Sequence, residues 1–294
     1  MKLSKHRRKG EFDRSREMLI RVSMKARKQG IKPWTQSPLG QHGFDPIGTA
    51  TCLVFKTMNQ MSFDKLVDYL KDSPQLLESL YLKKVPSRSA LHASFCKIRE
   101  EFITWMINSI SRPGMKGALY GDSTGVAING QRTWLDAKNG LSSRRDYRKL
   151  HIVRAKNGII VSHMVTDGRR HDVPVFEQMC KKIPQGSGYV ILDAAYLSHT
   201  ICTLIEDGGY IPVIMPKKGV RVKGFDAMGR MLRWHRDDLQ GFLKIYRKRS
   251  NVESTFSSMK RRLSGTLSAR KLDTQRIELG FFVLCHNLHV LATN

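Results

Sequence analysis

The spacing of apolar residues changes near residue 112 and divides the chain into two parts. Between residues 47 and 111, apolar residues recur at intervals of three or four, which is typical of amphipathic helices. The segment 86–110 shows this spacing at the following positions: Leu91, Phe95, Ile98, Phe102, Met106 and Ile110. Proline and glycine interrupt it in the segment SRPGMKG (111–117), where we place a domain boundary.

After this boundary, β-type runs alternate with helical segments. The runs are rich in valine, isoleucine and tyrosine and are bounded by glycine and proline. Asn157 and Gly158 lie between two of these runs and predict a β-hairpin. Helical segments at 173–183 and 198–208 then separate the later strands. This order predicts an α/β sheet in which three antiparallel strands come first and parallel strands follow.

We expect three regions along the chain. Residues 1–30 are a basic arm that is partly ordered at best. Residues 31–112 form a mainly helical domain whose short helices and tight turns suit either a helix-turn-helix motif or an ordinary helical bundle. The candidate recognition helix is the segment SRSALHASFCKIR. Residues 113–294 form the α/β domain.

The charge of the chain predicts a polyanionic partner. Lysine and arginine number 51 against 25 acidic residues, so the net charge is +26 and the isoelectric point is near 10.2. Such a surface attracts nucleic acid and gains affinity from the release of its counterions. Solubility alone does not require so large an imbalance. We therefore expect the protein to bind nucleic acid.

The cysteines and the apolar segments exclude several classes of protein. The five cysteines include no CxxC pair, which argues against zinc ribbons and a disulfide framework and favours a reducing compartment. The basic N-terminal residues are not followed by an apolar segment, so we expect no secretory signal. No run approaches the ~18 apolar residues that a membrane span requires. A soluble cytoplasmic protein is expected.

Two aspartates stand near the ends of predicted strands. Asp122 follows the run GALYG, and Asp193 ends the run YVIL. Functional sites of open α/β sheets form in the crevice at the strand ends. Either aspartate alone could simply begin a turn.

A third carboxylate, Glu253, lies in the segment YRKRSNVESTFSSMK (246–260). With ~3.6 residues per turn and Tyr246 at 0°, Arg249, Glu253 and Lys260 fall at about 300°, 340° and 320°. An apolar stripe lies beside this narrow arc: Ile245, Val252, Phe256, Met259 and Leu263. The helix is expected to pack this stripe on the sheet and to hold the four polar residues along the edge of the contact.

Two interpretations of this helix are open. The first is a surface ion pair between Arg249 and Glu253 at positions i and i+4. The second is a metal site in which Glu253 and the two aspartates supply the oxygen ligands that Mg²⁺ prefers, while the basic neighbours hold a phosphate backbone. The second explains more, because an ion pair alone does not account for Tyr246 and Lys260 on the same arc.

The spacing Tyr246-x2-Arg249-x3-Glu253-x6-Lys260 resembles the Y-x2-R-x3-E-x6-K signature of DDE transposases from prokaryotic insertion sequences. The segments GDSTG and LDAAY resemble the two aspartate motifs of that family. The resemblance covers about residues 117–290. It implies a ribonuclease-H-like mixed sheet flanked by helices, preceded by a mainly helical N-terminal domain that binds the DNA end.

The resemblance also implies the roles of the site residues. Asp122, Asp193 and Glu253 would be the catalytic residues and would hold two Mg²⁺ ions, for which Mn²⁺ can substitute. The other signature residues would contact the phosphates of the transposon end: Tyr246, Arg249 and Lys260.

Two further residues are weaker candidates. Trp234 could stack on a flipped base, or it could pack on the domain. His171 and Asp172, in the segment GRRHDVP, could touch the site, but a turn before the helix at Val173 is the favoured role.

The function implied by the resemblance is metal-dependent DNA cleavage and strand transfer at the ends of an insertion sequence. The partners would be double-stranded DNA, as terminal inverted repeats and target, and a second copy of the chain in a homodimer. The location would be the cytoplasm, on the nucleoid. Two alternatives remain: a ribonuclease-H-like endonuclease without strand transfer, and a DNA-binding relic that no longer catalyses.

Overall fold

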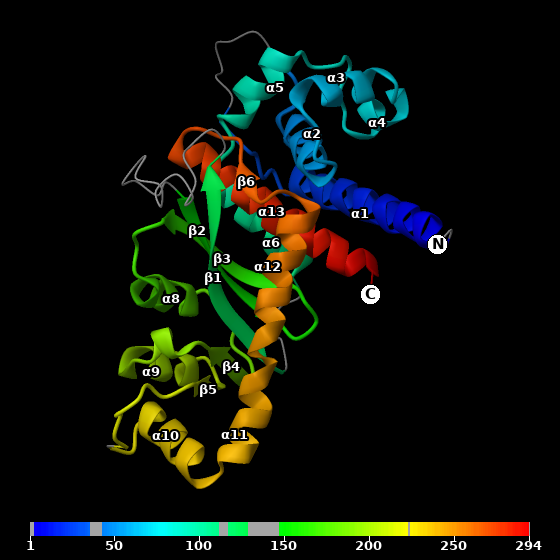
Figure 1. Cartoon of the computed structure of the whole chain (residues 1–294). Helices are drawn as coiled ribbons and strands as arrows, with labels where there is room; N and C mark the ends of the chain where they lie inside the picture. Colours follow the sequence, from blue (N-terminus) through cyan, green and yellow to red (C-terminus); the bar gives the residue numbers. More distant parts are fainter. Residues whose placement is uncertain (1–2, 36–42, 112–116, 129–146, 223, 294) are drawn as a thin grey trace, which may run out of the picture. The chain divides into compact units, whose positions relative to one another are not determined.

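The computed structural model describes residues 3–35, 43–111, 117–128, 147–222 and 224–293, with side chains from residue 10 onward (Figure 1). The chain divides into two compact units. The helical unit comprises Met1–Ser111 and Leu267–Asn294, and the α/β unit comprises Arg112–Thr266. Most of the predicted boundary segment, 111–117, lies outside the described residues. No helix within the described ranges is long and apolar enough to cross a membrane.

The helical unit is built around its last helix. Its helices are α1 (Leu3–Lys28), α2 (Pro46–Met58), α3 (Phe63–Lys71), α4 (Pro74–Ser79), α5 (Arg88–Phe95), α6 (Glu100–Ile110) and α13 (Leu272–Thr293). α13 is buried on most of its surface from Thr274 to Leu288, and α1, α2 and α6 pack against it. The sequence prediction assigned these C-terminal residues to the 113–294 region. Residues 267–294 cluster instead with the helical unit, because a helix that is buried on nearly every side needs cover all round.

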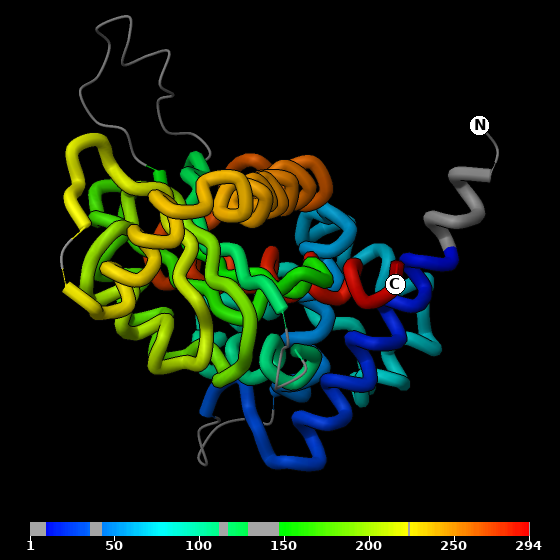
Figure 2. Tube along the Cα trace, turned by 90° about the horizontal axis from the view of Figure 1, so that it is seen from below, coloured from blue at the N-terminus to red at the C-terminus, as the bar shows by residue number. Residues whose placement is uncertain are grey.

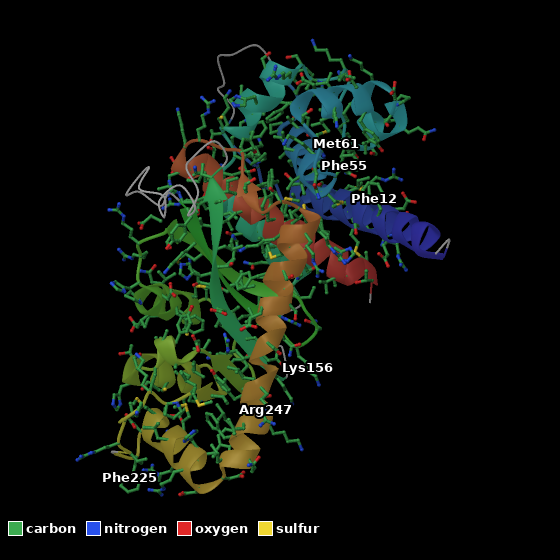
Figure 3. The ribbon with its side chains drawn as sticks, in the orientation of Figure 1. Phe12, Phe55, Met61, Lys156, Phe225 and Arg247 are labelled. Carbon is green, nitrogen blue, oxygen red and sulfur yellow. The ribbon has the colours of Figure 1, made fainter. Side chains whose placement is uncertain are left out.

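Residues 3–28 form one long helix, not the partly ordered arm that the basic composition suggested. Three buried apolar residues in its second half are spaced by three and four positions: Leu19, Val22 and Ala26. The Phe12 ring lies 5.8 Å from the Phe55 ring of α2 (Figure 3). Composition alone does not show this apolar face, because basic residues outnumber the apolar residues of the helix.

The predicted helical segment 86–110 is interrupted. α5 begins after Ser87, whose side chain accepts a hydrogen bond from the Ala90 amide at 3.2 Å, as expected of an N-cap residue. The helix ends at Phe95, and α6 starts at Glu100. The amide of Arg99 donates to the carbonyl oxygen of Pro33 at 3.0 Å instead of continuing the helix.

The sheet of the α/β unit has the spatial order β3-β2-β1-β4-β5. Its strands are β1 (Leu119–Ile128), β2 (Tyr147–Ala155), β3 (Ile160–Asp167), β4 (Gly188–Leu192) and β5 (Tyr210–Ile214). A short strand, β6 (Thr266–Leu267), falls at the sequence boundary of the two units. β1, β2 and β3 pair antiparallel, whereas β4 pairs parallel to β1 and to β5. The predicted order of antiparallel and parallel strands, with a hairpin at Gly158, is confirmed.

Helices cover both faces of this sheet. They are α8 (Asp172–Cys180), α9 (His199–Asp207), α10 (Ala227–Asp237), α11 (Leu239–Tyr246) and α12 (Ser250–Arg262), with single 3-10 turns at η1 (Ala194–Tyr196) and η2 (Arg247–Arg249). α12 packs beside β1 (Figures 1 and 2), while α8 packs on β2 and β3. The helices predicted at 173–183 and 198–208 are therefore confirmed as α8 and α9.

β1 presents a different set of side chains to each face, because side chains alternate along a strand. Asp122 and Thr124 contact residues of η2 and α12. Ser123 contacts Asp172 of α8. Gly121 lies on the same face as Ser123, where a Cβ atom would meet the side chain of Phe176.

We predict that Gly121→Ala destabilises the α/β unit. A Cβ atom at this position would lie 2.5 Å from both Leu192 Cδ2 and Phe176 Cε2. Neither side chain has room to withdraw from a packed core, so the free energy of unfolding should fall by about 1–3 kcal/mol in urea titrations. Gly265→Ala is the matched control, because no atom lies within 4 Å of its Cβ position. Equal stability of the two variants would contradict the packing argument.

Candidate active site

The two aspartates that were predicted at strand ends lie on neighbouring strands. Asp193 directly follows β4, and its side chain accepts a hydrogen bond from the Ala194 amide at 2.8 Å. Asp122 lies inside β1, because this strand continues past it in antiparallel pairing with β2. The parallel register pairs Tyr120 with Ile191, and two further residues along each strand bring Asp122 level with Asp193. Pairing between neighbouring strands therefore brings the two carboxylates together.

Arg249 connects the strand carboxylate to the helix carboxylate. Its Nη1 donates to Asp122 Oδ2 at 3.1 Å, and its Nη2 donates to Glu253 Oε1 at 2.5 Å. Tyr246 lies within hydrogen-bonding reach of both Asp193 and Arg249. The ion pair of the first interpretation thus exists, but the same guanidinium also reaches a carboxylate 127 residues away in the chain.

The helix that carries these residues is not continuous. Tyr246 ends α11, Arg249 lies in the 3-10 turn η2, and Glu253 is in the first turn of α12. The apolar stripe is buried within α12 as predicted, at Val252, Phe256 and Met259. Glu253 itself is more exposed than its predicted place at the core margin, with 55% of its side chain accessible.

α12 is held along β1 by side chains from alternate strand positions. The Tyr120 hydroxyl lies within reach of the Asn251 side chain, and Lys260 Nζ donates to Thr124 Oγ1 at 2.9 Å. Four strand residues span about 13 Å, which is also roughly the length of nine helical residues. β1 and α12 therefore cover the same length between the two contacts. Arg154, a buried residue of β2, adds a bond from Nη1 to the Asn251 carbonyl oxygen at 2.8 Å.

The protonation equilibria of the site follow from burial and from the crowding of like charges. Burial is the main influence on Asp122 and raises its pKa, and the neighbouring carboxylates of Asp193 and Glu253 act in the same direction. Burial opposes the charge on Arg249, but the three carboxylates outweigh it and raise the pKa of the guanidinium. Burial lowers the pKa of Lys260. A cation at the position of Arg249 thus stabilises all three carboxylates in their charged form.

Of the two weaker candidates, Trp234 lies on α10 and His171 directly precedes α8. Trp234 packs against Tyr189 and Phe242, with ring centroids 6.0 and 5.2 Å away, which matches the packing role considered from the sequence. His171 is exposed and precedes α8 without capping it through its side chain. Its neighbour Asp172 is the residue of this segment that reaches β1, where it contacts Ser123.

Sequence reasoning missed a second polar group on the other face of β1. It contains Ser123, Lys149 and His151, which surround Asp172. Lys149 and His151 occupy alternate positions of β2, a strand that is otherwise mostly apolar. Polar residues at alternate positions of a largely buried strand were the available signal.

The three carboxylates are not gathered into a closed metal site. Within the described residues, no group of three or more histidine, cysteine, aspartate or glutamate side chains stands close enough to hold a metal ion. Instead, Asp122 and Glu253 share the guanidinium of Arg249, with Asp193 close by. Three carboxylates from three separate elements converge on one positive charge, so this position favours a cation.

One of the comparisons with known proteins identifies the family of the chain. The family model for the transposase DDE domain matches residues 115–288. No curated protein sequence matches the chain. A solved structure of piggyBac transposase, in a synaptic complex with hairpin DNA, is similar with a TM-score of 0.48 and 11% identity, covering 94% of this chain and 70% of that chain. That likeness is too low to bear on the fold or the chemistry. The family model alone covers more than half of the chain, and the protein therefore belongs to the transposase DDE domain family and is a DDE transposase.

Proposed function

We propose that this DDE transposase serves a prokaryotic insertion sequence: it cleaves DNA at the ends of the element and joins the freed ends to target DNA. The observation that carries the proposal is the convergence of Asp122, Asp193 and Glu253 on the guanidinium of Arg249. The three acids come from β1, from the end of β4 and from α12, so only the folded chain brings them together.

The fold of the α/β unit supports a ribonuclease-H-like assignment. Its first three strands form an antiparallel meander, and the next two strands add in parallel on the other side of β1. This topology puts Asp122 on the central strand and Asp193 directly after the neighbouring strand. The helical region 31–112 would bind the end of the element, with α5 as the helix that reads the DNA. This reading role rests on the resemblance and on the short helices of the region.

The donor set fits a divalent cation. Carboxylate oxygens are the hard ligands that Mg²⁺ prefers, and a positive group already lies between Asp122 and Glu253. Two Mg²⁺ ions, or Mn²⁺ in their place, would supply activation of the attacking oxygen and stabilisation of the leaving oxygen. Asp122, Asp193 and Glu253 would hold them.

The basic residues of the site would position the DNA. Lys260 lies beside Thr124 on the same face of β1 as Asp122, so a phosphate bound by Lys260 would lie along that strand. Arg249 would turn from the carboxylates towards a phosphate oxygen, because its planar group donates several hydrogen bonds at once. Tyr246, which borders Asp193, would add a hydroxyl donor. The net charge of +26 supports double-stranded DNA as the partner, and we propose that a homodimer binds the two ends.

A strand-transfer assay distinguishes this function from its alternatives. Purified protein, Mg²⁺, a duplex carrying the sequence that flanks the gene and a supercoiled plasmid should give a covalently joined product. An endonuclease without strand transfer would cut the duplex and leave the plasmid unjoined. A DNA-binding relic would do neither and would still retard the duplex on a gel.

We predict that Glu253→Gln abolishes cleavage and leaves DNA binding within about twofold of the wild-type affinity. Glutamine keeps the shape of the side chain but loses the charge that a metal ion requires. Glu101→Gln, an exposed acid of α6, is the matched control and should cleave normally. Cleavage by Glu253→Gln at the wild-type rate in Mg²⁺ would leave the i,i+4 ion pair as the better account of this residue.

Asp193→Cys tests whether this side chain contacts the metal directly. Sulfur suits Mg²⁺ poorly and Mn²⁺ better, so the variant should be inactive in Mg²⁺ and recover measurable cleavage in Mn²⁺. Asp193→Ala should stay inactive in both ions. If Asp193 only caps the η1 turn, Asp193→Cys will lose thermal stability and show no preference between the two ions.

Arg249→Ala and Lys260→Ala should each weaken binding of the DNA end. A lost phosphate contact reduces the slope of log affinity against log salt concentration by ~1. Arg247→Ala, which removes an exposed charge two residues from Arg249, serves as the control (Figure 3). Unchanged slopes in the two site variants would remove both residues from the phosphate contact.

A further inference from the structure

A group of polar side chains lies on the face of β1 opposite to α12. We name it the α8-side cluster and define it by five residues: Ser123, Lys149, His151, Thr166 and Asp172. Asp172 is at its centre. Lys149 Nζ donates to Asp172 Oδ1 at 2.9 Å, and Ser123 Oγ donates to Asp172 Oδ2 at 3.2 Å. Neither the cleavage chemistry nor the DNA contacts proposed above use this cluster.

The strand register explains why these residues meet. Ser123 of β1 is paired with His151 of β2, and Lys149 of β2 is paired with Thr166 of β3. Because paired residues point to the same face, these side chains form a row across three strands. His151 Nε2 bonds to Thr166 Oγ1 at 2.9 Å within this row. Asp172, the first residue of α8, comes down onto the row from the helix.

The cluster is connected to Asp122 through Ser123. The backbone amide of Ser123 donates to Asp122 Oδ1 at 2.8 Å, while its hydroxyl donates to Asp172 on the other face. Ser123 therefore holds one carboxylate on each side of the strand. Arg249 bonds the second oxygen of Asp122. A continuous series of hydrogen bonds thus runs from Lys149 through Asp172, Ser123 and Asp122 to Arg249.

The second aspartate motif also reaches the cluster. Tyr196 follows Asp193 by three residues in the LDAAY segment and is buried, with 1% of its surface exposed. Burial, followed by the nearby carboxylates of Asp172 and Asp122, raises the pKa of its hydroxyl, which also lies near Ser123. The hydroxyl has no hydrogen-bond partner among the described residues, so Tyr196 is held here by packing, with the Phe176 ring centroid 5.2 Å away.

The cluster costs free energy of folding, because one of its polar atoms is buried without a hydrogen-bond partner. His151 is 1% exposed, and its Nδ1 atom has no hydrogen-bond partner among the described residues, 3.8 Å from Asp172 Oδ1. Burial lowers the pKa of His151 to about 4, so the ring is neutral and does not pair with the carboxylate as a cation. Apolar residues of similar size in such places are often neutral or stabilising. The position of the cluster, directly behind Asp122, suggests what it contributes.

We propose that Asp172 is a positioning residue for the metal-binding carboxylate: by holding the hydroxyl of Ser123 it fixes the Ser123 amide, which in turn fixes the orientation of Asp122. The inference rests on the proposed role of Asp122 as a metal ligand. Groups that orient metal ligands in this way change metal affinity by about 10–100-fold when they are removed.

The test is a titration of Mn²⁺ into the full-length protein, alone and with a saturating linear duplex, with free Mn²⁺ followed by electron paramagnetic resonance. Asp172→Asn and Ser123→Ala should each weaken binding by about 10-fold or more. If Asp172 acts through Ser123, the double variant should bind no more weakly than the poorer single variant. Ser123→Thr keeps the hydroxyl and should restore binding. Asp167→Asn, which removes an exposed charge at the end of β3, should bind as the wild type does.

The same titration separates a failure of this inference from a failure of the metal site. Binding by Asp122→Asn at wild-type affinity, or no binding by the wild-type protein, would refute the metal site and the positioning role with it. Loss of binding in Asp122→Asn together with normal binding in Asp172→Asn and Ser123→Ala would refute the positioning role alone. Thermal unfolding identifies variants that have lost the fold. Ser123→Ala, which removes one oxygen atom and no charge, then carries the test if Asp172→Asn unfolds.

Discussion

The packing of α12 on β1 is the contact on which the rest of the site depends. A strand turns every second side chain to the same face, and a helix returns to the same face every three to four residues. Between Tyr120 and Thr124 the strand offers three such side chains, and the helical segment meets each of them with a polar partner. Buried apolar residues of α12 fix the distance between the helix and the strand. The polar contacts then only need to set the position of the helix along the strand.

The carboxylates of the site repel one another, and the basic side chain of Arg249 beside them reduces this repulsion. Burial and like charges both disfavour the ionised form of Asp122 and raise its pKa, and the Ser123 amide and Arg249 offset them only in part. A divalent ion would compensate more strongly, since it carries twice the charge in a smaller volume. Under the proposed function, Arg249 and a metal ion would compete for Asp122 and Glu253, and a phosphate that attracts Arg249 away from them would favour the ion. If the site works as proposed, binding of DNA and binding of metal would be coupled through Arg249.

The sequence revealed those features that depend on regular spacing. Apolar runs and the Asn157–Gly158 turn predicted the strands and their pairing, and the stripe through Phe256 predicted the face of α12 that is buried. Features that depend on tertiary contacts were missed. The carbonyl of Pro33, distant in the sequence, takes the amide that would have continued α5, and the turn at η2 interrupts a helix whose periodicity had looked continuous. The basic composition of residues 3–28 concealed a helix because composition carries no information on which face is buried. Asp172 lies in the segment GRRHDVP, but only the folded chain, with β1 and β2 in register, shows that it reaches Ser123.

The place of α13 in the helical unit has a consequence for biosynthesis. The first 111 residues and residues 267–294 form one compact unit, but residues 112–266 are translated between them. At ~5–20 residues per second, this interval lasts roughly 10–30 s. During that time α1, α2 and α6 expose on the ribosome the apolar surfaces that α13 later covers. The α/β unit, which is contiguous in sequence, has everything it needs to fold first. The nascent helices are thus exposed to chaperones and proteases until α13 emerges.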